Sequence, residues 1–407
     1  MEKYDIAVVG GGASGLAAAI TAKREQPQLK IVILERLSRI GKKLLSTGNG
    51  RCNLTNRNLT PDFYSGSCKA LFPFVQVFSV EDFFLSLGVI CKADEAGRVY
   101  PASGTAAAVL DSLRLETARI GIEVICDFTV SEIEKKGVFT IKSSGGEKLS
   151  AKAVILAGGG MSQPDLGSDG SALKICRKLS IPVATPRPAL VPVKTDSNMV
   201  RCLKGIRTEA KVSVTLDGKK IKSEYGEVQF GDGTLSGICI FNLSAVCSEY
   251  LNRTEIQLDL LPDKSFPEIC TLIESIAKIR SEAALEDLLS GIFNKRIGMA
   301  IIKQATKHST AEPVKTLTTS DIKAIAGLIK CWKFPVYGTC GYEKSQVTAG
   351  GVSIEAINES LEAKGCPGLF LCGEILDING DCGGYNLTFA FASGCLAGRS
   401  CADKLSV

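Results

Sequence analysis

Histidine is nearly absent from this chain of 407 residues, which has only His308. Its 16 cysteines include no C-x-x-C pair, so the spacing typical of zinc sites and of dithiol redox centres is missing. A Ser-His-Asp hydrolase would have to be built on that single histidine, which we interpret as a surface residue beside Lys307. We therefore predict no metal site, and we interpret most of the cysteines as buried or reduced thiols.

Long apolar runs are also missing: none reaches the roughly eighteen residues that a membrane-spanning helix needs. The first five residues pass directly into a β-branched run, with no stretch typical of a signal peptide. We expect a cytoplasmic protein with no membrane partner. A chain of this length with 45% hydrophobic and 22% charged residues is typical of two or three globular domains.

The charge balance is mild, with a formal net charge of +5, and does not by itself indicate a nucleic-acid-binding protein. Residues 194–222 are locally basic. We interpret this stretch as the solvated face of a small sheet; the alternative is a rim that attracts an anionic substrate. Its cations are Lys194, Arg201, Lys204, Arg207, Lys211, Lys219, Lys220 and Lys222, against Asp196, Glu209 and Asp217.

The N-terminal region has the pattern of a dinucleotide-binding fold. Residues 4–9 predict a buried parallel strand, and the Ala-rich residues 16–23 predict a helix. Between them lies G-x-G-x-x-G, in which Gly10 allows the tight turn, Gly12 lets the backbone approach a pyrophosphate and Gly15 lets helix and strand pack closely. The helix N-terminus would then face the phosphates.

A second strand strengthens this interpretation. Residues 31–34 are β-branched and apolar, and they end in Glu35, twenty residues after Gly15. A carboxylate at that point accepts hydrogen bonds from a ribose diol. Strand, glycine turn, helix, strand and acid therefore all agree with a dinucleotide site.

Three further segments favour FAD over NAD. Residues 36–53 form a Gly- and Lys-rich loop where a plain NAD domain would proceed into its next helix. Residues 152–160 predict a buried strand that ends in small residues, so that backbone can approach a cofactor. Residues 368–374 predict another strand, ending in Gly373-Glu374; in FAD enzymes of the two-dinucleotide class, the acid at this point binds the ribityl chain.

The C-terminal region carries a second glycine turn. Residues 380–387 are followed by an Ala-rich stretch that predicts a helix through Ala397. Such a turn would place a helix N-terminus at the pyrimidine edge of the flavin, where negative charge develops on reduction. We therefore expect a non-covalent FAD site assembled from both ends of the chain.

With these motifs, the sequence resembles the BaiN-type NAD(P)/FAD-dependent oxidoreductases, a bacterial flavoprotein family also described as aminoacetone-oxidase-family FAD-binding enzymes. The matching segments are residues 8–15, 41–53, 348–352 and 373–387, so the resemblance spans the chain. It implies an α/β fold: a discontinuous FAD-binding Rossmann domain of the two-dinucleotide type, with an inserted small β-barrel and a helical cap. The expected ranges are 1–190 and 344–407 for the FAD domain, 191–262 for the barrel and 263–343 for the cap.

The middle of the chain is compatible with such an insert. Residues 211–216 alternate as in a strand, and Asp217-Gly218 after them is a hairpin turn signal. From residue 266 to residue 330 the pattern turns helical, with apolar residues at helical spacing in 273–279 and 285–292.

Three residues are candidates for catalysis. Arg51 could orient an anionic or carbonyl substrate, or instead hold an FAD phosphate or its own loop. Cys52 could donate a proton, although we favour a packed thiol, and Tyr385 has a structural alternative. The predicted cofactor-binding residues are Gly10, Gly12, Ala13, Ser14, Gly15, Glu35, Arg36, Lys42, Lys43, Asn49, Gly50, Arg51, Cys52, Asn53, Val130, Ala157, Gly158, Gly159, Gly373, Glu374, Asp377, Gly383, Gly384, Tyr385, Asn386 and Leu387.

One segment departs from the family pattern. The family commonly carries Phe-Thr-His-x-Gly-x-Ser-Gly-Pro in the barrel, whereas residues 230–238 here place Asp232 at the histidine position and Ile238 at the proline position. If that histidine serves the substrate in relatives, the identity of the substrate does not carry over to this chain.

Three hypotheses about function follow. The first is an oxidoreductase in which NAD(P)H reduces FAD and hydride passes to an activated C=C or C=O of a small molecule. The second is an enzyme that reduces a pyrimidine of RNA to dihydrouridine, with residues 194–222 as the RNA contact. The third is a non-catalytic FAD-binding sensor.

No second complete G-x-G-x-x-G is present, so NAD(P)H would enter transiently over the flavin. The sequence indicates no particular oligomeric state.

Overall fold

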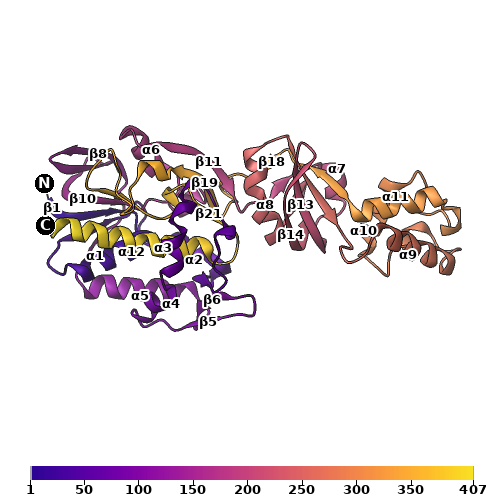
Figure 1. The fold of residues 1–407 in the computed structure, drawn as a ribbon, viewed down its shortest axis with the longest axis horizontal. Coiled ribbons are helices and arrows are strands. Elements are labelled where there is room, and N and C mark those ends of the chain that lie inside the picture. The colour runs from indigo at the N-terminus through magenta and orange to yellow at the C-terminus, as the bar shows by residue number, and fades with distance from the viewer. Residues whose placement is uncertain (1, 407) are drawn as a thin grey trace. The chain divides into compact units, whose positions relative to one another are not determined.

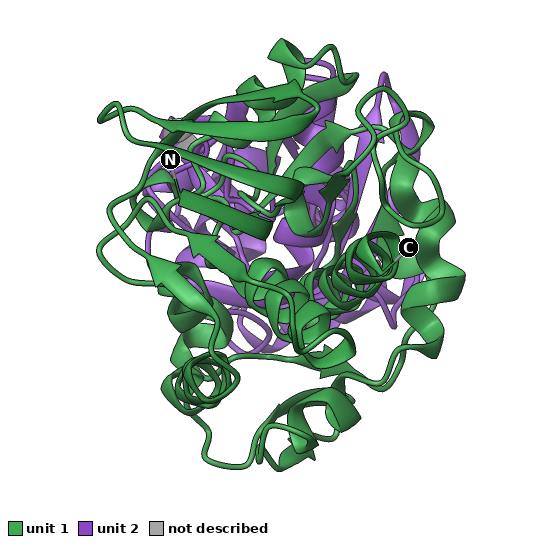
Figure 2. Ribbon diagram, turned by 90° about the vertical axis from the view of Figure 1, so that its left-hand side faces the viewer, with its two compact units in different colours: residues 1–188, 345–407 green, residues 189–344 purple. Residues whose placement is uncertain are grey.

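The computed structural model describes residues 2–406 and consists of two compact units (Figure 2). Unit 1 comprises residues 1–188 and 345–407, and unit 2 comprises residues 189–344. Each unit has a hydrophobic core of its own. The chain therefore leaves unit 1 once, builds unit 2 and returns.

Unit 1 is built on a seven-stranded sheet of order β7-β2-β1-β10-β9-β8, with β20 also paired to β10. Five of these strands run parallel, and β9 and β8 continue the sheet in antiparallel pairing. Strands buried on both faces need continuous apolar sequence, which the N-terminal runs supply. The strands are β1 (Glu2–Val9), β2 (Ile31–Leu34), β3 (Thr55–Asn56), β4 (Tyr64–Ser65), β5 (Cys91–Ala93), β6 (Arg98–Pro101), β7 (Glu123–Ile125), β8 (Val130–Lys136), β9 (Val138–Ser143), β10 (Lys148–Leu156), β11 (Val183–Ala189), β19 (Val347–Val352), β20 (Leu369–Leu371) and β21 (Asn379–Gly380).

Helices α1 and α12 of unit 1 lie side by side, although they come from opposite ends of the chain (Figure 1). Two glycines make the contact possible: a Cβ on Gly394 would lie 2.4 Å from the Ser14 carbonyl oxygen, and one on Gly398 would lie 2.3 Å from that of Ala18. The two helices thus pack backbone against backbone. The helices of unit 1 are α1 (Ala13–Glu25), α2 (Lys42–Ser46), α3 (Phe72–Val77), α4 (Val80–Leu85), α5 (Ala106–Arg119), α6 (Ser171–Lys178) and α12 (Tyr385–Leu405).

The elements predicted for unit 1 are present. The strands expected at 4–9 and 31–34 correspond to β1 and β2, and the helix expected at 16–23 lies within α1. The strands expected within 152–160 and 368–374 correspond to β10, which ends at Leu156, and β20, which ends at Leu371. Two details differ. Helix α12 continues to Leu405 rather than ending at Ala397, and the loop expected at 36–53 contains the short helix α2. Gly41, in a left-handed conformation (φ 72°), starts α2, and extended backbone at Thr47 ends it.

Unit 2 contains a second seven-stranded sheet, of order β17-β16-β13-β14-β15-β12-β18. The predicted hairpin is present between β13 and β14, with Asp217 (φ 49°) and Gly218 (φ 80°) both left-handed, as hairpin turns of two residues require. The strands are β12 (Val193–Lys194), β13 (Arg207–Leu216), β14 (Lys219–Phe230), β15 (Thr234–Ser236), β16 (Thr254–Asp259), β17 (Trp332–Pro335) and β18 (Gly338–Thr339).

The helices of unit 2 lie mainly between β16 and β17. They are α7 (Ser197–Arg201), α8 (Ile238–Glu249), α9 (Phe266–Ile279), α10 (Lys295–Ala305) and α11 (Thr319–Lys330). Strands β17 and β18 fall inside the range predicted for the helical cap, yet they belong to the sheet. The segment from α9 to α11 therefore interrupts the sheet rather than following it.

The helical pattern at 285–292 was wrong as a prediction of an α-helix. Leu285–Asp287 forms a 3-10 turn, and further turns lead to α10. Leu285, Leu288 and Leu289 are nevertheless buried in the core of unit 2. The apolar spacing correctly indicated which side chains are buried. A compact series of turns can bury residues at that spacing as well as a helix can.

Candidate functional site

The glycine turn after β1 is packed tightly against the end of β10. A Cβ on Gly10 would lie 2.5 Å from the Ala157 carbonyl oxygen, and one on Gly15 would lie only 1.9 Å from that of Gly10. Gly10 also has a φ of 110°, which side chains rarely adopt. These two glycines are therefore required by the protein's own packing.

Gly12 differs from its neighbours because a Cβ there would meet nothing within 4 Å. It is the N-cap residue of α1, where no side chain caps the helix and the first turn holds no acidic residue. The first backbone N–H groups of α1 therefore have no acceptor from a capping side chain, and there is open space beside Gly12, an arrangement that suits a phosphate group.

The Glu35 carboxylate lies beside this turn. It is buried and accepts hydrogen bonds from the backbone N–H groups of Gly11 and Leu37, both at 2.9 Å. An ionised carboxylate offers about four acceptor positions, so two remain for a ribose diol. The two backbone bonds fix the orientation of the carboxylate.

The predicted Arg36 forms an ion pair with Asp169, a residue that the motifs did not single out. Asp169 also accepts a hydrogen bond of 3.0 Å from the backbone N–H of Ser171 at the start of α6. Burial opposes its ionisation, but the hydrogen bonds from Ser171 and the Arg36 cation outweigh this and lower the pKa of Asp169.

The small residues after β10 accommodate neighbouring protein atoms. A Cβ on Gly158 would lie 2.6 Å from that of Ala172, and one on Gly159, which is left-handed, 2.8 Å from the Ser168 Oγ. One on Gly160 would lie 2.4 Å from the Thr348 Oγ1. Here the sequence signal of close backbone approach is explained by packing within unit 1.

Glu374 lies in a polar network that joins distant segments. Its Oε2 accepts from Lys43 Nζ at 2.7 Å, and its Oε1 accepts from the backbone N–H of Thr348 at 2.9 Å. The Thr348 Oγ1 in turn accepts from the N–H groups of Met161 (2.8 Å) and Ser162 (3.1 Å). Thr348 was noted only as part of a family motif; the fully buried hydroxyl at the centre of this network carried no sequence signal.

Segment 373–374 is also fixed to both terminal helices. A Cβ on Gly373 would lie 2.3 Å from the Ser14 Oγ of α1. The backbone N–H of Gly373 donates to the Ser393 Oγ of α12 at 2.9 Å. The structure thus brings the N-terminal and C-terminal motifs together.

The loop at 48–52 has an unusual backbone. Gly48, Asn49, Gly50 and Cys52 are all left-handed, with φ between 54° and 80°. The Cys52 side chain is fully buried, and burial raises the pKa of its thiol to about 12, so at neutral pH it is a packed, protonated thiol.

Arg51, which follows this left-handed turn, is exposed and points back onto its own region of the chain. Its guanidinium carbon lies 4.2 Å from the centre of the Tyr100 ring, within the range of a cation–π interaction. This contact corresponds to the alternative in which Arg51 holds its own loop.

Asn53 and Gly384 meet where this loop approaches the start of α12. A Cβ on Gly384 would lie 2.9 Å from the Asn53 Oδ1 and 2.5 Å from the Thr55 carbonyl oxygen. The Asn53 Oδ1 is buried and has no hydrogen-bond partner. A buried acceptor without a partner is uncommon in folded proteins and often marks a bound group.

Tyr385 and Asn386 turn their side chains toward the protein. The Tyr385 ring stacks on Phe63 with centroids 4.4 Å apart, its hydroxyl donates to the Asn58 carbonyl at 3.4 Å, and burial raises its pKa to about 12. The Asn386 amide closes the glycine turn by bonding to both the N–H and the carbonyl of Gly380, each at 2.8 Å. Both side chains hold the turn in shape.

The remaining predicted residues lie at varied distances from these contacts. Asp377 is engaged by the turn at 66–68, because its Oδ2 accepts from the Ser67 N–H at 2.9 Å. The Gly383 carbonyl oxygen accepts a hydrogen bond from Asn56 Nδ2 at 3.0 Å. Val130 is buried at the start of β8, Ala13 and Leu387 are partly buried against the core, and Lys42 is partly exposed at the start of α2.

Three features of unit 1 fit a flavin dinucleotide: the open helix N-terminus at Gly12, the oriented carboxylate of Glu35, and the unpartnered Asn53 oxygen beside the start of α12. The first two suit a pyrophosphate and a ribose. The third suits an N–H donor at the other end of the ligand. The residues present therefore fit FAD.

The basic stretch of unit 2 is partly neutralised. Asp232 bridges Arg201 (2.9 Å) and Lys204 (3.2 Å), which lower its pKa through hydrogen bonds from Lys204 and then Arg201. Arg207 pairs with Glu227 and Lys222 with Glu224, across the β13–β14 hairpin or within β14. Half of the eight cations thus have acidic partners that lie beyond residue 222 in sequence, which is why sequence counting missed them.

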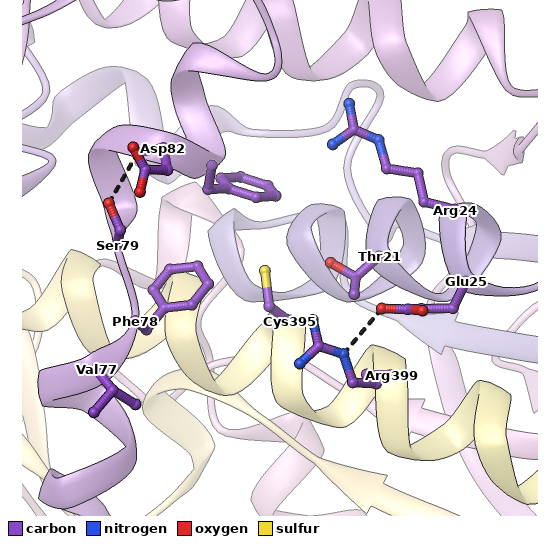
Figure 3. A pocket seen from close by; sticks show the side chains of 10 residues that line it. Thr21, Arg24, Glu25, Val77, Phe78, Ser79, Asp82, Cys395 and Arg399 are labelled. Carbon is purple, nitrogen blue, oxygen red and sulfur yellow. Dashed lines mark hydrogen bonds and ion pairs between the residues drawn. The ribbon is translucent and has the colours of Figure 1, made fainter.

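A separate pocket of about 410 Å³ lies in unit 1 between the last turns of α1, residues 77–83 and α12 (Figure 3). It shares no residue with the predicted cofactor site. Its two arginines are already engaged, Arg24 with Glu116 at 2.8 Å and Arg399 with Glu25 at 2.9 Å. Both arginines of the pocket therefore already have a carboxylate partner.

Three further observations concern the described residues 2–406. They contain no group of three or more His, Cys, Asp or Glu side chains placed to hold a metal ion. None of their helices is both long and apolar enough to cross a bilayer. All sixteen cysteines are free of disulfides, and nine are buried.

Comparison with known protein families agrees with the fold. The family model described as the HI0933-like protein Rossmann domain matches residues 4–400. The chain belongs to this family. Among curated HI0933-like relatives, a protein from Clostridium scindens named 3-dehydro-bile acid delta(4,6)-reductase is 32% identical over 98% of this chain and 99% of its own length. A Haemophilus influenzae protein named ribosomal RNA dihydrouridine synthase is 27% identical over 95% of each chain.

Solved structures share the fold of this HI0933-like chain at lower identity. An Escherichia coli quinol fumarate reductase matches all of this chain and 71% of its own, with a TM-score of 0.52 and 15% identity. A quinol–fumarate reductase with menaquinol molecules matches all of this chain and 72% of its own, with a TM-score of 0.53 and 15% identity.

Proposed function

We propose that this protein is an FAD-dependent oxidoreductase that takes hydride from NAD(P)H and passes it to an activated C=C or C=O of a small molecule. The observation that carries the proposal is the meeting of the two terminal motifs in unit 1. Glu374 contacts Lys43, and the start of α12 lies beside Asn53. Together with Gly12 and Glu35, these groups fit one extended dinucleotide. The full-length relative named as a bile acid reductase supports the reaction type.

In this proposal FAD supplies the redox chemistry, and the chain supplies position and local charge. The start of α1 binds the pyrophosphate, Glu35 accepts from a ribose, and Glu374, oriented by Lys43 and Thr348, accepts from the ribityl chain. The predicted catalytic set changes accordingly: Cys52 and Tyr385 serve as packing residues, and Arg51, which is exposed, remains the candidate for orienting substrate.

We also propose a domain assignment. Unit 1 is the discontinuous FAD domain. In unit 2, residues 191–262 together with β17 and β18 correspond to the small barrel, and the helical segment between β16 and β17 corresponds to the cap.

The test is anaerobic mixing of the purified flavoprotein with NADH or NADPH, followed by reoxidation with enone and ketone acceptors. Bleaching of the flavin absorbance by a nicotinamide, with multiple turnovers on an acceptor, is the expected result, and it excludes a non-catalytic sensor. If neither nucleotide bleaches the flavin, NAD(P)H is not the reductant and the proposed reaction is wrong.

A second candidate, reduction of a pyrimidine in ribosomal RNA, is favoured by the two relatives named ribosomal RNA dihydrouridine synthase. The pairing of Arg201, Lys204, Arg207 and Lys222 with acids weighs against residues 194–222 as its landing site. Salt separates the candidates: RNA binding weakens steeply as ionic strength rises because counterions are released, whereas a neutral small substrate shows almost no slope.

A further inference from the structure

The side-chain oxygen of Asn53, Oδ1, is buried and accepts no hydrogen bond from the chain. Oδ1 is shielded from solvent and without a partner, in a structure where the neighbouring polar side chains of Asn56 and Asn386 each make two or more hydrogen bonds. A buried acceptor that goes unpaired costs free energy of folding. A ligand that donates a hydrogen bond to this acceptor would offset that cost.

Two glycines lie close to Asn53. A Cβ on Gly48 would lie 3.5 Å from the Asn53 Cβ, and one on Gly384 would lie 2.9 Å from the Asn53 Oδ1. Both glycines are left-handed, with φ of 56° and 104°. Asn53 therefore lies beside two left-handed glycines, and the ring of Tyr100 is also near, 3.6 Å from a Cβ placed on Gly48.

The start of α12 adds hydrogen-bond donors beside this acceptor. Gly384 is the N-cap residue of this 21-residue helix, where no side chain caps the helix and the first turn contains no acidic residue. Its first N–H groups therefore have no acceptor from a capping side chain. One acceptor and a set of donors thus lie at adjoining positions.

The pyrimidine edge of an oxidised flavin carries the complementary pattern. It presents two carbonyl oxygens, at C2 and C4, on either side of the ring's single N–H donor, at N3. We infer that Asn53 Oδ1 accepts the N3–H of FAD and that the N–H groups at the start of α12 donate to the adjacent carbonyl. This inference rests on the proposed FAD site and adds the residue that recognises the flavin ring.

The test compares two ligands, FAD and FAD methylated at N3, in wild-type protein and in variants of Asn53. Apoprotein prepared from the full chain is titrated with FAD and with FAD methylated at N3, and dissociation constants are taken from the change in flavin fluorescence. Wild-type protein should prefer FAD by at least about tenfold, the effect of losing one hydrogen bond to a buried acceptor. In Asn53→Ala and in the isosteric Asn53→Leu, the preference should fall to within about threefold of unity.

Two variants serve as controls. Asn53→Asp keeps an acceptor at the same place and should keep the wild-type preference. Asn358→Ala removes an amide whose Oδ1 is already satisfied by Ser360 and Glu362 on the surface of unit 1, and it should also keep it. If Asn53→Ala does not fold, Asn53→Leu provides the same readout.

An unchanged preference in the acceptor-free variants, or a wild-type preference near unity, overturns the role of Asn53 while leaving the FAD site intact. Failure of wild-type apoprotein to bind FAD at all overturns the proposed function itself. The two failures are therefore distinguishable in one set of titrations.

Discussion

At the scale of single residues, the glycines of the first turn have separable tasks. Gly15 is enclosed by backbone, whereas Gly12 faces open space. Both belong to the same motif, and sequence alone assigns them roles without a way to rank their effects on folding and on binding.

Alanine substitutions should separate these roles. Gly15→Ala forces a methyl group to within 1.9 Å of the Gly10 oxygen, so we expect it to lower the free energy of unfolding by about 2–3 kcal/mol or more. Gly12→Ala has room for its methyl group and an allowed φ of −86°, so the apoprotein should stay within about 1 kcal/mol of wild type. Its affinity for FAD should nevertheless fall at least about tenfold, because the methyl group occupies the space reserved for phosphate.

Urea unfolding of the apoprotein and FAD titration provide the two measurements. A Gly12→Ala protein that binds FAD as wild type does would show that the start of α1 does not face the cofactor. Equal stability of Gly15→Ala and wild type would contradict the packing argument.

The single histidine provides a second prediction at this scale. His308 Nδ1 lies 2.8 Å from the Glu312 Oε2, and Nε2 lies 3.4 Å from the Asp321 Oδ2. Hydrogen bonding to Glu312 and then to Asp321 outweighs burial and raises the pKa of His308 above its ordinary value. A raised pKa means that the folded state favours the protonated ring, so this stabilisation is complete at pH values below about 6.5 and is lost as the pH rises through the folded pKa.

Because the chain has one histidine, its ring signals can be followed by NMR without ambiguity. We expect a titration midpoint above 6.5 in wild type and a lower midpoint in Glu312→Gln and Asp321→Asn. The stability difference between wild type and His308→Gln should be larger at pH 5.5 than at pH 8.5. A midpoint at or below 6.5 would show that the two carboxylates do not act on the ring.

At the scale of elements, the contact between α1 and α12 leaves no room for a side chain at the two glycines of α12 that face α1. Gly398→Ala would place a methyl group 2.3 Å from the Ala18 carbonyl oxygen, so the helices must separate. We expect a loss of about 2–3 kcal/mol in the free energy of unfolding, with weaker FAD binding because α12 also supports segment 373–374 through Ser393.

Gly327→Ala in α11 is the matched control. The nearest heavy atom to its added Cβ lies at 4.0 Å, so the substitution should stabilise unit 2 by up to about 1 kcal/mol through helix propensity. Thermal or urea unfolding measures both variants. If Gly398→Ala behaves like Gly327→Ala, the helix contact is looser than the backbone distances indicate.

Local patterns in the sequence predicted many of these elements because they encode local or repeating physics. Apolar runs gave β1, β2 and β10, and the Asp217-Gly218 pair gave the hairpin of unit 2. The stretch at 285–292 failed because burial at a helical spacing does not require a helix. The continuation of α12 to Leu405 has no distinctive start or stop signal of its own.

The site was only partly predictable for a related reason. The glycine turn and Glu35 are recognisable because their roles depend on spacing along the chain. The Thr348 network and the Arg36–Asp169 pair join residues more than a hundred positions apart. The unpartnered Asn53 oxygen depends on the absence of a partner in space. No single-chain pattern reports such features.

At the scale of the whole molecule, the many buried thiols make stability sensitive to alkaline pH. Burial raises the pKa of Cys52, Cys68, Cys176, Cys247 and Cys372 to about 12 in each case. A thiol with a raised folded pKa stabilises the fold fully below its unfolded pKa of about 8.5, and this stabilisation is lost as the pH rises toward 12. Each such thiol contributes a slope of about 1.4 kcal/mol per pH unit in that window.

The four of these thiols that lie in unit 1 would together remove about 6 kcal/mol per pH unit, which is comparable to the whole stability of a typical domain. We therefore expect cooperative unfolding between about pH 9 and pH 10.5, followed by circular dichroism with reductant present. Cys247→Ala should reduce the slope by about 1.4 kcal/mol per pH unit, whatever its effect at pH 7. Cys202→Ser, at the exposed cysteine, should leave the slope unchanged, and a flat profile to pH 11 would contradict the burial of these thiols.

Because unit 1 is formed from two separate segments of the chain, its parts are translated at different times. Residues 1–188 emerge first, but the helix that covers α1 and the turn that carries Glu374 are translated only after residues 189–344. At about 5–20 residues per second, the intervening segment delays their arrival by roughly 10–30 seconds. During that interval α1 lacks its glycine-packed partner and the nascent chain presents an uncovered apolar surface, whereas unit 2 is already complete in sequence. At the FAD site proposed above, cofactor binding would then follow the synthesis of α12.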